Sequence, residues 1–437
     1  MKNPLKNIVK KQKEGNPVGI CSVCTGNGYV IEAALELAKE TNSVVLIEST
    51  ANQVDQNGGY TGMKPADFIE YVYQLADQVG IEHSRVFVGG DHLGPLTVVD
   101  KPEQEAMAYA RTLLHDYVVA GYTKIHIDTS MKVADDDPDT RLSDETISRR
   151  GAELARVCED AYQELLKTHP DAVRPVYIVG SEVPIPGGAQ DPNAGMQVTR
   201  VEDFKATVSA FEQAFEKQGL QETWKDVMAV VVQPGVEEKD AGCEEYQRER
   251  AAKLMASIKE FPNLVFEGHS TDYQTKYKLR ELVEDGVGIL KVGPGLTLAM
   301  REALFSLAYI EDVCLHGHEE EKSHFIDVLE QEMLKEDKYW KKYYHGNEDE
   351  IWFKRKFSFS DRCRYYMPMP AVAAARTKMI NNLRRYGINL AALSQFMPLQ
   401  YTKVREGRLE NDPEALIKDK IKYILDEYLF ATHQDQL

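Results

Sequence analysis

The feature of this chain that most constrains its fold is a regular alternation of short apolar runs with amphipathic segments between residues 18 and 310. Each run is rich in valine, isoleucine and leucine, has the length of a buried strand, and precedes a segment of helical periodicity. The predicted strands are residues 18–25, 43–50, 85–95, 124–130, 175–182, 227–233, 264–269 and 289–294. Eight such units predict an α/β fold, a (β/α)8 TIM barrel within residues 1–312. An open doubly wound sheet also alternates in this way, but eight regular units favour the barrel.

The alternation stops at about residue 312. Residues 313–437 are charged and helical in pattern and contain no low-complexity linker, so we predict a mostly helical extension docked on the barrel. Its segment 360–366, SDRCRYY, concentrates residue types that bind phosphate, and Arg362 and Arg364 are the candidates. The alternative for this segment is a solvated surface strand.

Composition narrows the class of function. The formal net charge of −18 argues against a nucleic-acid-binding face. No apolar stretch approaches the roughly 18 residues that span a membrane, and the first residues lack the apolar core of a signal peptide. The six cysteines are scattered, as is typical of a reducing cytoplasm. Cys21 and Cys24 are close in sequence, but residues three apart in a strand face opposite sides, so we expect two small core residues.

Polar side chains end most of the predicted strands, and this is where barrels carry function. Inward-facing positions are those that alternate with apolar, outward-facing ones. In the strand 264–269, Leu264 and Phe266 face outward, so Glu267 and His269 face inward. The same rule and the strand ends give the other rim residues: Glu48, Asp91, His92, His126, Asp128, Glu182, Gln233 and Lys291. A purely structural core would not place polar groups at seven of eight strand ends, so the sequence predicts a functional rim.

Two histidines and a carboxylate on this rim form a candidate metal site. His92, Glu182 and His269 are ligand types of a divalent metal, with zinc the first choice. Taken singly, each histidine is better explained as a hydrogen-bonded structural residue. Their placement on three strands favours the metal site. His126 is predicted to lie one layer deeper, as a supporting residue.

The other rim residues are candidates for proton transfer and substrate binding. Glu48, Asp91 and Asp128 are the candidate acid–base carboxylates. The turn 293–295 precedes a helix whose N–H groups attract phosphate, although an ordinary Gly/Pro turn is the alternative. Lys291 could form a Schiff base with a ketose, pair with Glu267 or hold a phosphate, and we favour the last two roles. The predicted substrate-binding and phosphate-binding residues are Gln233, Ser270, Thr271, Lys291, Gly293, Gly295, Arg362 and Arg364.

Long motifs in the chain resemble a known family. They are VGGDHLGP, KIHIDTSM, GSEVPIPGG, VVVQPGVE, EGHSTDYQT, LKVGPGLTLAMREALF and SDRCRYY. With them the chain resembles the Z-subunit family of class II tagatose-bisphosphate aldolase (GatZ/KbaZ), over essentially its whole length. The resemblance implies a class II aldolase-like (β/α)8 barrel and ketohexose-phosphate metabolism. Some members resemble accessory subunits of a separate aldolase chain, and related proteins are metal-dependent 4-epimerases of ketohexoses or their phosphates.

One departure from true class II aldolases separates these functions. Those enzymes carry a strand-six histidine in a Gly-Thr-Ala-His-Gly motif, whereas this strand ends in Val-Val-Gln233-Pro234-Gly235. We therefore predict C4 epimerisation of fructose 1,6-bisphosphate or fructose 6-phosphate to the tagatose epimer by retro-aldol and aldol steps. The alternative is a non-catalytic accessory subunit, and a third hypothesis is a Schiff-base aldolase that uses Lys291. An aldolase catalytic chain and further copies of this chain are the candidate partners.

Overall fold

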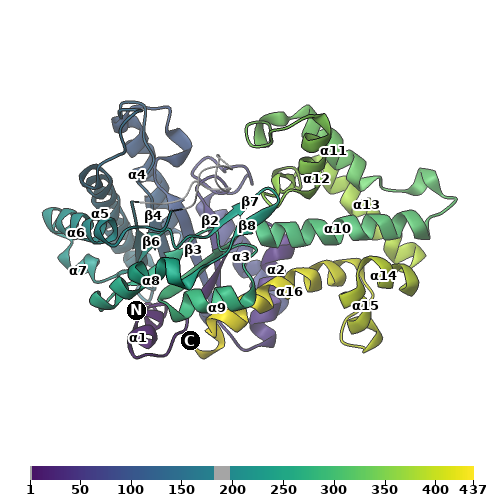
Figure 1. Cartoon of the computed structure of the whole chain (residues 1–437), viewed down its shortest axis with the longest axis horizontal. Coiled ribbons are helices and arrows are strands. Elements are labelled where there is room, and N and C mark those ends of the chain that lie inside the picture. The colour runs from purple at the N-terminus through teal and green to yellow at the C-terminus, as the bar shows by residue number, and fades with distance from the viewer. Residues whose placement is uncertain (1, 182–196) are drawn as a thin grey trace.

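The predicted alternation folds into a closed parallel barrel, described by a computed structural model over residues 2–181 and 197–437 (Figure 1). Its strands run in the order β1-β10-β9-β6-β5-β4-β3-β2, so the first and last strands pair. The (β/α)8 prediction is confirmed. The strands are β1 (Ile20–Cys24), β2 (Val45–Thr50), β3 (Val86–Leu93), β4 (Lys124–Ile127), β5 (Val176–Val179), β6 (Val227–Val232), β9 (Val265–Gly268) and β10 (Val287–Val292).

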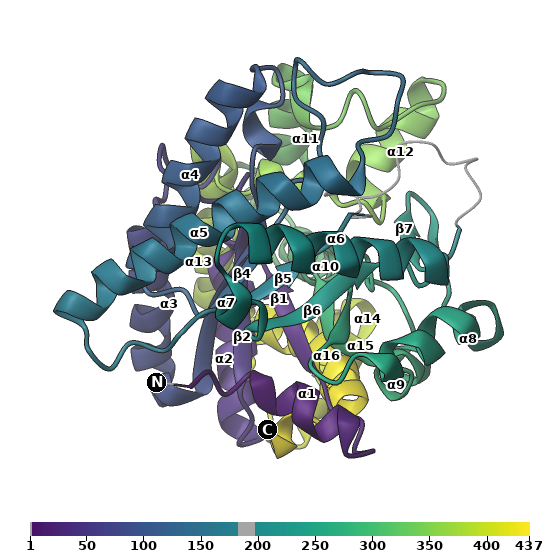
Figure 2. The same cartoon turned by 90° about the vertical axis from the view of Figure 1, so that its left-hand side faces the viewer.

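A layer of helices surrounds the strands. Side-chain caps fix several starts: Asn27 accepts hydrogen bonds from the N–H groups of Tyr29 and Val30, and Ser143 accepts one from Thr146. Helices α4, α5 and α6 pack side by side on one flank (Figure 2). The helices of this layer are α2 (Gly28–Glu40), α3 (Pro65–Val79), α4 (Glu103–Val119), α5 (Asp144–Thr168), α6 (Val201–Lys217), α7 (Gln221–Trp224), α8 (Arg248–Ser257), α9 (Lys276–Glu284) and α10 (Pro294–Cys314).

The interior of the barrel is apolar at one end and charged at the other. The N-terminal helix α1 (Lys6–Lys13) inserts Ile8 and Val9 into an apolar cluster with Leu46, Phe87 and Ile178, and so closes the N-terminal end of the barrel. At the carboxyl ends of the strands, the interior positions carry buried charged side chains. The apolar end therefore supplies packing energy, and the charged end is where chemistry is feasible.

The extension is joined to the barrel by one continuous hydrophobic core. Helix α10 projects away from the barrel at the right of Figure 1, and the following helices pack around it. The last helix, α16 (Pro413–Thr432), returns to pack against α2, α9 and β1, and so belongs to the barrel's own outer layer. The remaining helices are α11 (Phe325–Lys335), α12 (Glu348–Phe357), α13 (Pro370–Tyr386), α14 (Leu390–Phe396) and α15 (Pro398–Arg405).

Two local elements differ from the expectation. A short hairpin, β7 (Glu237–Lys239) and β8 (Gly242–Glu244), follows β6 where we predicted only a loop and a helix. The alternative of a solvated strand at 360–366 is wrong: Arg362–Tyr365 is a 3-10 turn in which Arg362 and Cys363 are buried. The hairpin holds this turn through hydrogen bonds of Asp240 with the Phe359 N–H and the Ser358 hydroxyl. No helix in the described part of the chain is long and apolar enough to span a bilayer.

Candidate active site

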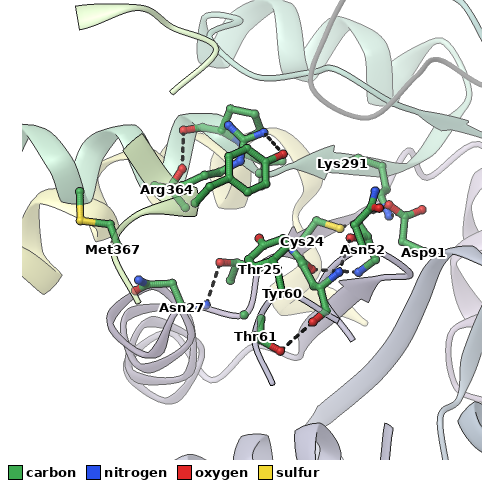
Figure 3. Close-up of a pocket in the computed structure, with 18 of the residues that line it drawn as sticks. Cys24, Thr25, Asn27, Asn52, Tyr60, Thr61, Asp91, Lys291, Arg364 and Met367 are labelled. Carbon is green, nitrogen blue, oxygen red and sulfur yellow. Dashed lines mark hydrogen bonds and ion pairs between the residues drawn. The ribbon is translucent and has the colours of Figure 1, made fainter. Parts of the chain in front are cut away.

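A cavity of about 290 Å³ opens at the carboxyl ends of the strands, between the barrel and the extension (Figure 3). This is the rim that the sequence predicts. Strand ends form its floor, and the extension forms one wall. The barrel contributes Cys24, Asp91, His92, His269, Ser270, Asp272, Lys291 and Gly293, the loop before α3 contributes Gln53, Tyr60 and Thr61, and the extension contributes Arg364, Tyr365, Met367, Pro368 and Arg376.

Four buried side chains from three strands and the segment after β9 meet at and just beneath the floor, and of these Asp91 and His269 reach the cavity surface. Asp91, His126, Glu267 and His269 each offer a ligand atom, and these atoms all lie within 4.8 Å of one another. We call them the floor group. The ring of His92 lies beside them, with centroids 5.2 Å from the ring of His126 and 5.0 Å from that of His269. His126, expected to be only a supporting residue, is thus a full member of the group.

The protonation states of the floor group suit a divalent metal. Burial lowers the pKa of His269 to about 4, so its imidazole is neutral at pH 7. Burial alone would raise the pKa of Asp91, but the charges of His92 and Lys291 hold it well below its usual range. Among the described residues, Nε2 of His126 is buried without a hydrogen-bond partner. Imidazole nitrogens and ionised carboxylates are ligands of zinc and similar ions, so these residues fit a metal.

The floor group coincides only in part with the triad that the sequence predicts. His269 is in the group, and Glu182 lies outside the described residues. His92 is paired instead: its Nδ1 lies 2.9 Å from Oδ2 of Asp128. Burial opposes its charge, but Asp91 and Asp128 outweigh burial and raise the pKa of His92. Its backbone has a φ of 50°, a conformation that non-glycine residues adopt mainly at strained functional positions.

A layer of buried ion pairs supports the floor from below. The ammonium of Lys124 lies 2.7 Å from Glu48 and 2.8 Å from Glu267, and all three side chains are fully buried. Glu48 also accepts a hydrogen bond from the hydroxyl of Ser22. A Cβ on Gly89 would lie 2.9 Å from Cγ of Glu48, which explains a glycine at that point of β3. Glu48 does not line the cavity, so the structure places this predicted acid–base residue in the supporting layer.

Lys291 connects this layer to the cavity. Its ammonium lies 2.8 Å from Asp91 and 3.3 Å from Glu48, not beside Glu267. Burial favours the neutral amine, but the charges of Asp91 and Glu48 outweigh burial and raise the pKa of Lys291 well above its usual value. A permanently protonated amine is a poor nucleophile, so this geometry argues against a Schiff base.

Four predicted substrate contacts form other hydrogen bonds in the structure. The N–H groups of Gly293 and Gly295 donate to Oδ1 of Asp272, at 3.0 and 2.7 Å, so they are not available to a phosphate. The hydroxyl of Thr271 donates to the backbone oxygen of Lys291 beneath the cavity. The side chain of Gln233 accepts hydrogen bonds from the N–H groups of residues 235 and 236, and so stabilises a turn. Of the predicted set on the barrel, Ser270, Lys291 and Gly293 lie on the cavity surface.

The extension brings two arginines to the cavity. Arg364, which the sequence predicts, lies on the wall and donates a hydrogen bond to the hydroxyl of Tyr365 at 3.1 Å. Arg362 instead stacks on the ring of Tyr343, 3.3 Å from its centroid, and does not line the cavity. Arg376 of α13, which the sequence analysis missed, also lines it. No carboxylate among the described residues forms an ion pair with Arg376, so its charge is free for an anionic ligand.

An acidic pair lies opposite these arginines. Asp272 and Glu238 both line the cavity and are nearly fully buried. Burial and the charge of Glu238 raise the pKa of Asp272 to about 7. Burial also raises the pKa of Glu238, whose Oε2 has no hydrogen-bond partner in the described part of the chain. The sequence offered no signal for Glu238, because the hairpin that carries it interrupts the barrel pattern.

Comparison with known proteins decides the family. Residues 5–433 match the family described as D-tagatose-1,6-bisphosphate aldolase subunit GatZ/KbaZ-like. The chain belongs to this family. A protein of Salmonella agona named D-tagatose-1,6-bisphosphate aldolase subunit GatZ is 43% identical over 431 residues, which cover 99% of this chain and all of the relative. Its namesake in Klebsiella pneumoniae subsp. pneumoniae is 43% identical over 427 residues, 98% of this chain and 99% of the relative.

A solved structure supports the same family fold. It is titled a probable tagatose 6 phosphate kinase from Sinorhizobium meliloti 1021, and its sequence is 41% identical to this chain. The two superpose with a TM-score of 0.85 over 95% of this chain and all of that one. The fold described above, including the extension, is therefore shared by proteins whose names refer to tagatose phosphates.

Proposed function

We propose that this chain acts as the Z-type subunit of a tagatose-bisphosphate aldolase and that its cavity binds a ketohexose phosphate. The names of the relatives support the first part. The observation that supports the second is a cavity with a polar floor and three cationic side chains, Lys291, Arg364 and Arg376, on its surface. Cations and polar groups in a concave site are what a phosphorylated sugar requires.

Co-expression with the catalytic chain of a tagatose-bisphosphate aldolase tests the subunit role. We expect the two chains to co-purify and the aldolase activity to survive longer at elevated temperature than that of the catalytic chain alone. Separate elution of the two chains, with unchanged aldolase lifetime, would contradict this role.

The floor group favours a second function, catalysis by this chain itself. The predicted reaction is C4 epimerisation of fructose 1,6-bisphosphate or fructose 6-phosphate. The C4 hydrogen of a 2-ketose is β to the carbonyl and not appreciably acidic, so direct proton abstraction fails. Cleavage of the C3–C4 bond, rotation of the aldehyde fragment and re-formation of the bond on its other face invert C4 instead.

Different residues of the cavity would perform the different parts of this reaction. A divalent ion held by Asp91, His126, Glu267 and His269 would act as a Lewis acid toward the substrate's oxygens. Lys291 stays protonated beside Asp91 and would stabilise negative charge that develops on a substrate oxygen. Arg364 and Arg376 would hold the phosphate and keep both fragments in the cavity while the aldehyde turns.

An assay of the purified chain alone tests catalysis. It is incubated with fructose 6-phosphate and with fructose 1,6-bisphosphate, with and without a chelator. Tagatose phosphate that disappears on chelation is the expected result. Absence of product from a fully metal-loaded chain would leave the accessory role as the function.

A further inference from the structure

We propose that Tyr365, which the extension contributes, is the acid–base residue that exchanges a proton with the C4 oxygen of the substrate. This inference rests on the proposed epimerase function. The phenol lines the cavity on the wall formed by the extension, away from the ion pairs of the floor. A residue of the extension would then take part in the chemistry as well as in binding.

The carboxylates of the floor are poorly suited to this role. Glu48 lies below the cavity surface and is paired with Lys124 and Lys291. Burial alone would raise the pKa of Asp128, but its hydrogen bond to His92 lowers the value to about 2. Asp91 is held by Lys291 and belongs to the floor group. Each of these carboxylates is already engaged by a buried cationic or imidazole partner, so none is free to exchange a proton with the substrate.

Aromatic contacts fix the ring of Tyr365. It stacks on Tyr339 with centroids 5.0 Å apart and an interplanar angle of 6°. On another side it meets Tyr60 of the loop before α3, at 5.2 Å and 68°, in an edge-to-face contact. Tyr60 also lines the cavity, so the contact joins the barrel loop to the extension across the site. A ring held in this way presents its hydroxyl in one orientation, which is what proton transfer requires.

The charges around Tyr365 favour its anion. Its oxygen accepts a hydrogen bond from Nη2 of Arg364, so the phenolic proton is directed elsewhere. Burial opposes ionisation, but the guanidinium groups of Arg364 and Arg362 outweigh it and lower the pKa of Tyr365. Their carbons lie 4.6 and 5.7 Å from the ring centroid. Among the described residues, the titratable groups that face the phenol are Arg362, Arg364, Asp361, Tyr60 and Tyr339.

Tyr365 alone can both accept the proton in the cleavage step and return it in the bond-forming step. The phenolate takes the proton of the C4 hydroxyl as the C3–C4 bond breaks. The O–H electron pair becomes the new C4=O bond, and the electrons of C3–C4 pass to C3 and on to the C2 oxygen as an enediolate. After the aldehyde fragment turns, C3 attacks its other face, the C2 carbonyl re-forms, and Tyr365 returns the same proton to the C4 oxygen.

Tyr365→Phe is the direct test, with Tyr339→Phe as the matched control that removes a hydroxyl from the adjacent ring. The turnover of fructose 6-phosphate by Y365F should fall about 10²- to 10⁴-fold, the range for loss of a general acid–base. Its dissociation constant by calorimetry should change little, and Y339F should resemble the wild type. The turnover rate of the wild type should rise with pH as the Tyr365 phenol ionises. The rate of Y365F should not show this rise. Wild-type turnover in Y365F, or an unchanged pH profile, would overturn the proposal.

Two further measurements separate this proposal from the failure of the proposed function or of folding. Ultraviolet titration should detect a tyrosinate that forms below the usual pH in the wild type and in Y339F and is absent in Y365F. This signal needs no turnover, and its absence from the wild type would overturn the proposal. In Arg364→Gln, the rising limb of the rate should move to higher pH because a stabilising charge is lost, and an unmoved limb would also overturn it.

Discussion

The floor and the wall of the cavity are built in opposite ways. On the floor, charged side chains neutralise one another: Lys124 bridges Glu48 and Glu267, and Lys291 bridges Asp91 and Glu48. On the wall, Arg376 has no carboxylate partner among the described residues and faces the cavity. The floor is thus rigid and internally neutralised, as a metal site would require, and the wall carries a charge that is free for a ligand.

Removing a floor ligand should have the largest effect. His126→Ala and His269→Ala should each abolish bound metal and turnover together, because a group of four ligands loses one. Elemental analysis measures the metal content, and the epimerase assay measures turnover. The control is His83→Ala, which changes a surface histidine that is paired with Asp77. Normal metal content and turnover in H126A would mean that the sequence-predicted set with His92 is the correct one.

Breaking the supporting layer should cost folding stability. Lys124→Met leaves buried Glu267 without its cation and Glu48 with Lys291 alone, and the expected loss is about 3–5 kcal/mol. Chemical denaturation measures the free energy of unfolding. The exposed pair of Lys225 and Glu222 provides the control, since Lys225→Met should cost at most about 1 kcal/mol. Equal losses of unfolding free energy in the two variants would contradict the conclusion that the buried ion pairs stabilise the fold more than an exposed pair does.

A wall residue should affect binding without affecting stability. Arg376→Ala should weaken the binding of fructose 6-phosphate about 10- to 100-fold, which is the loss expected when one charge-assisted hydrogen bond is removed. The midpoint of unfolding should stay unchanged. Calorimetry with unphosphorylated fructose is the internal control, because that sugar lacks the anion. If R376A weakened both sugars equally, Arg376 would not be a phosphate ligand.

A separate prediction concerns the pH dependence of stability. The pKa of Asp272 is raised to about 7 by burial and by Glu238, against an unfolded value near 3.8. The folded protein then binds more protons than the unfolded chain between these values, so its free energy of unfolding should decline as pH rises from 4 to 7. In Asp272→Asn, which keeps an oxygen for the N–H groups of Gly293 and Gly295, this decline should be smaller. Parallel stability curves for the two proteins would contradict the raised pKa.

The floor could be predicted from sequence because it follows from periodicity. Alternation within a strand determines which side chains point inward, and this placed Asp91, His126, His269 and Lys291 at one end of the barrel. The same rule also implies Lys124, two residues before His126, which the analysis overlooked. Relative height in the barrel was harder to predict. The alternation alone does not show that Glu48 lies below the cavity surface whereas Asp91 reaches it.

The wall could not be predicted because it depends on packing between segments far apart in the chain. Arg376 is an ordinary arginine of an amphipathic helix until α13 packs beside the strand ends. The turn 293–295 fits a phosphate-binding pattern, but Asp272 lies close enough to take its N–H groups. A carboxylate and a ligand can compete for the same N–H groups, and the sequence of the turn alone does not show which of them binds.

A crystal structure of the chain grown with a divalent metal and fructose 1,6-bisphosphate would test the central claim most directly. The account predicts metal density between His126, His269, Asp91 and Glu267, with the sugar lying between this floor and Tyr365 and a phosphate at Arg376. Sugar bound elsewhere, or a metal held without His126, would contradict it.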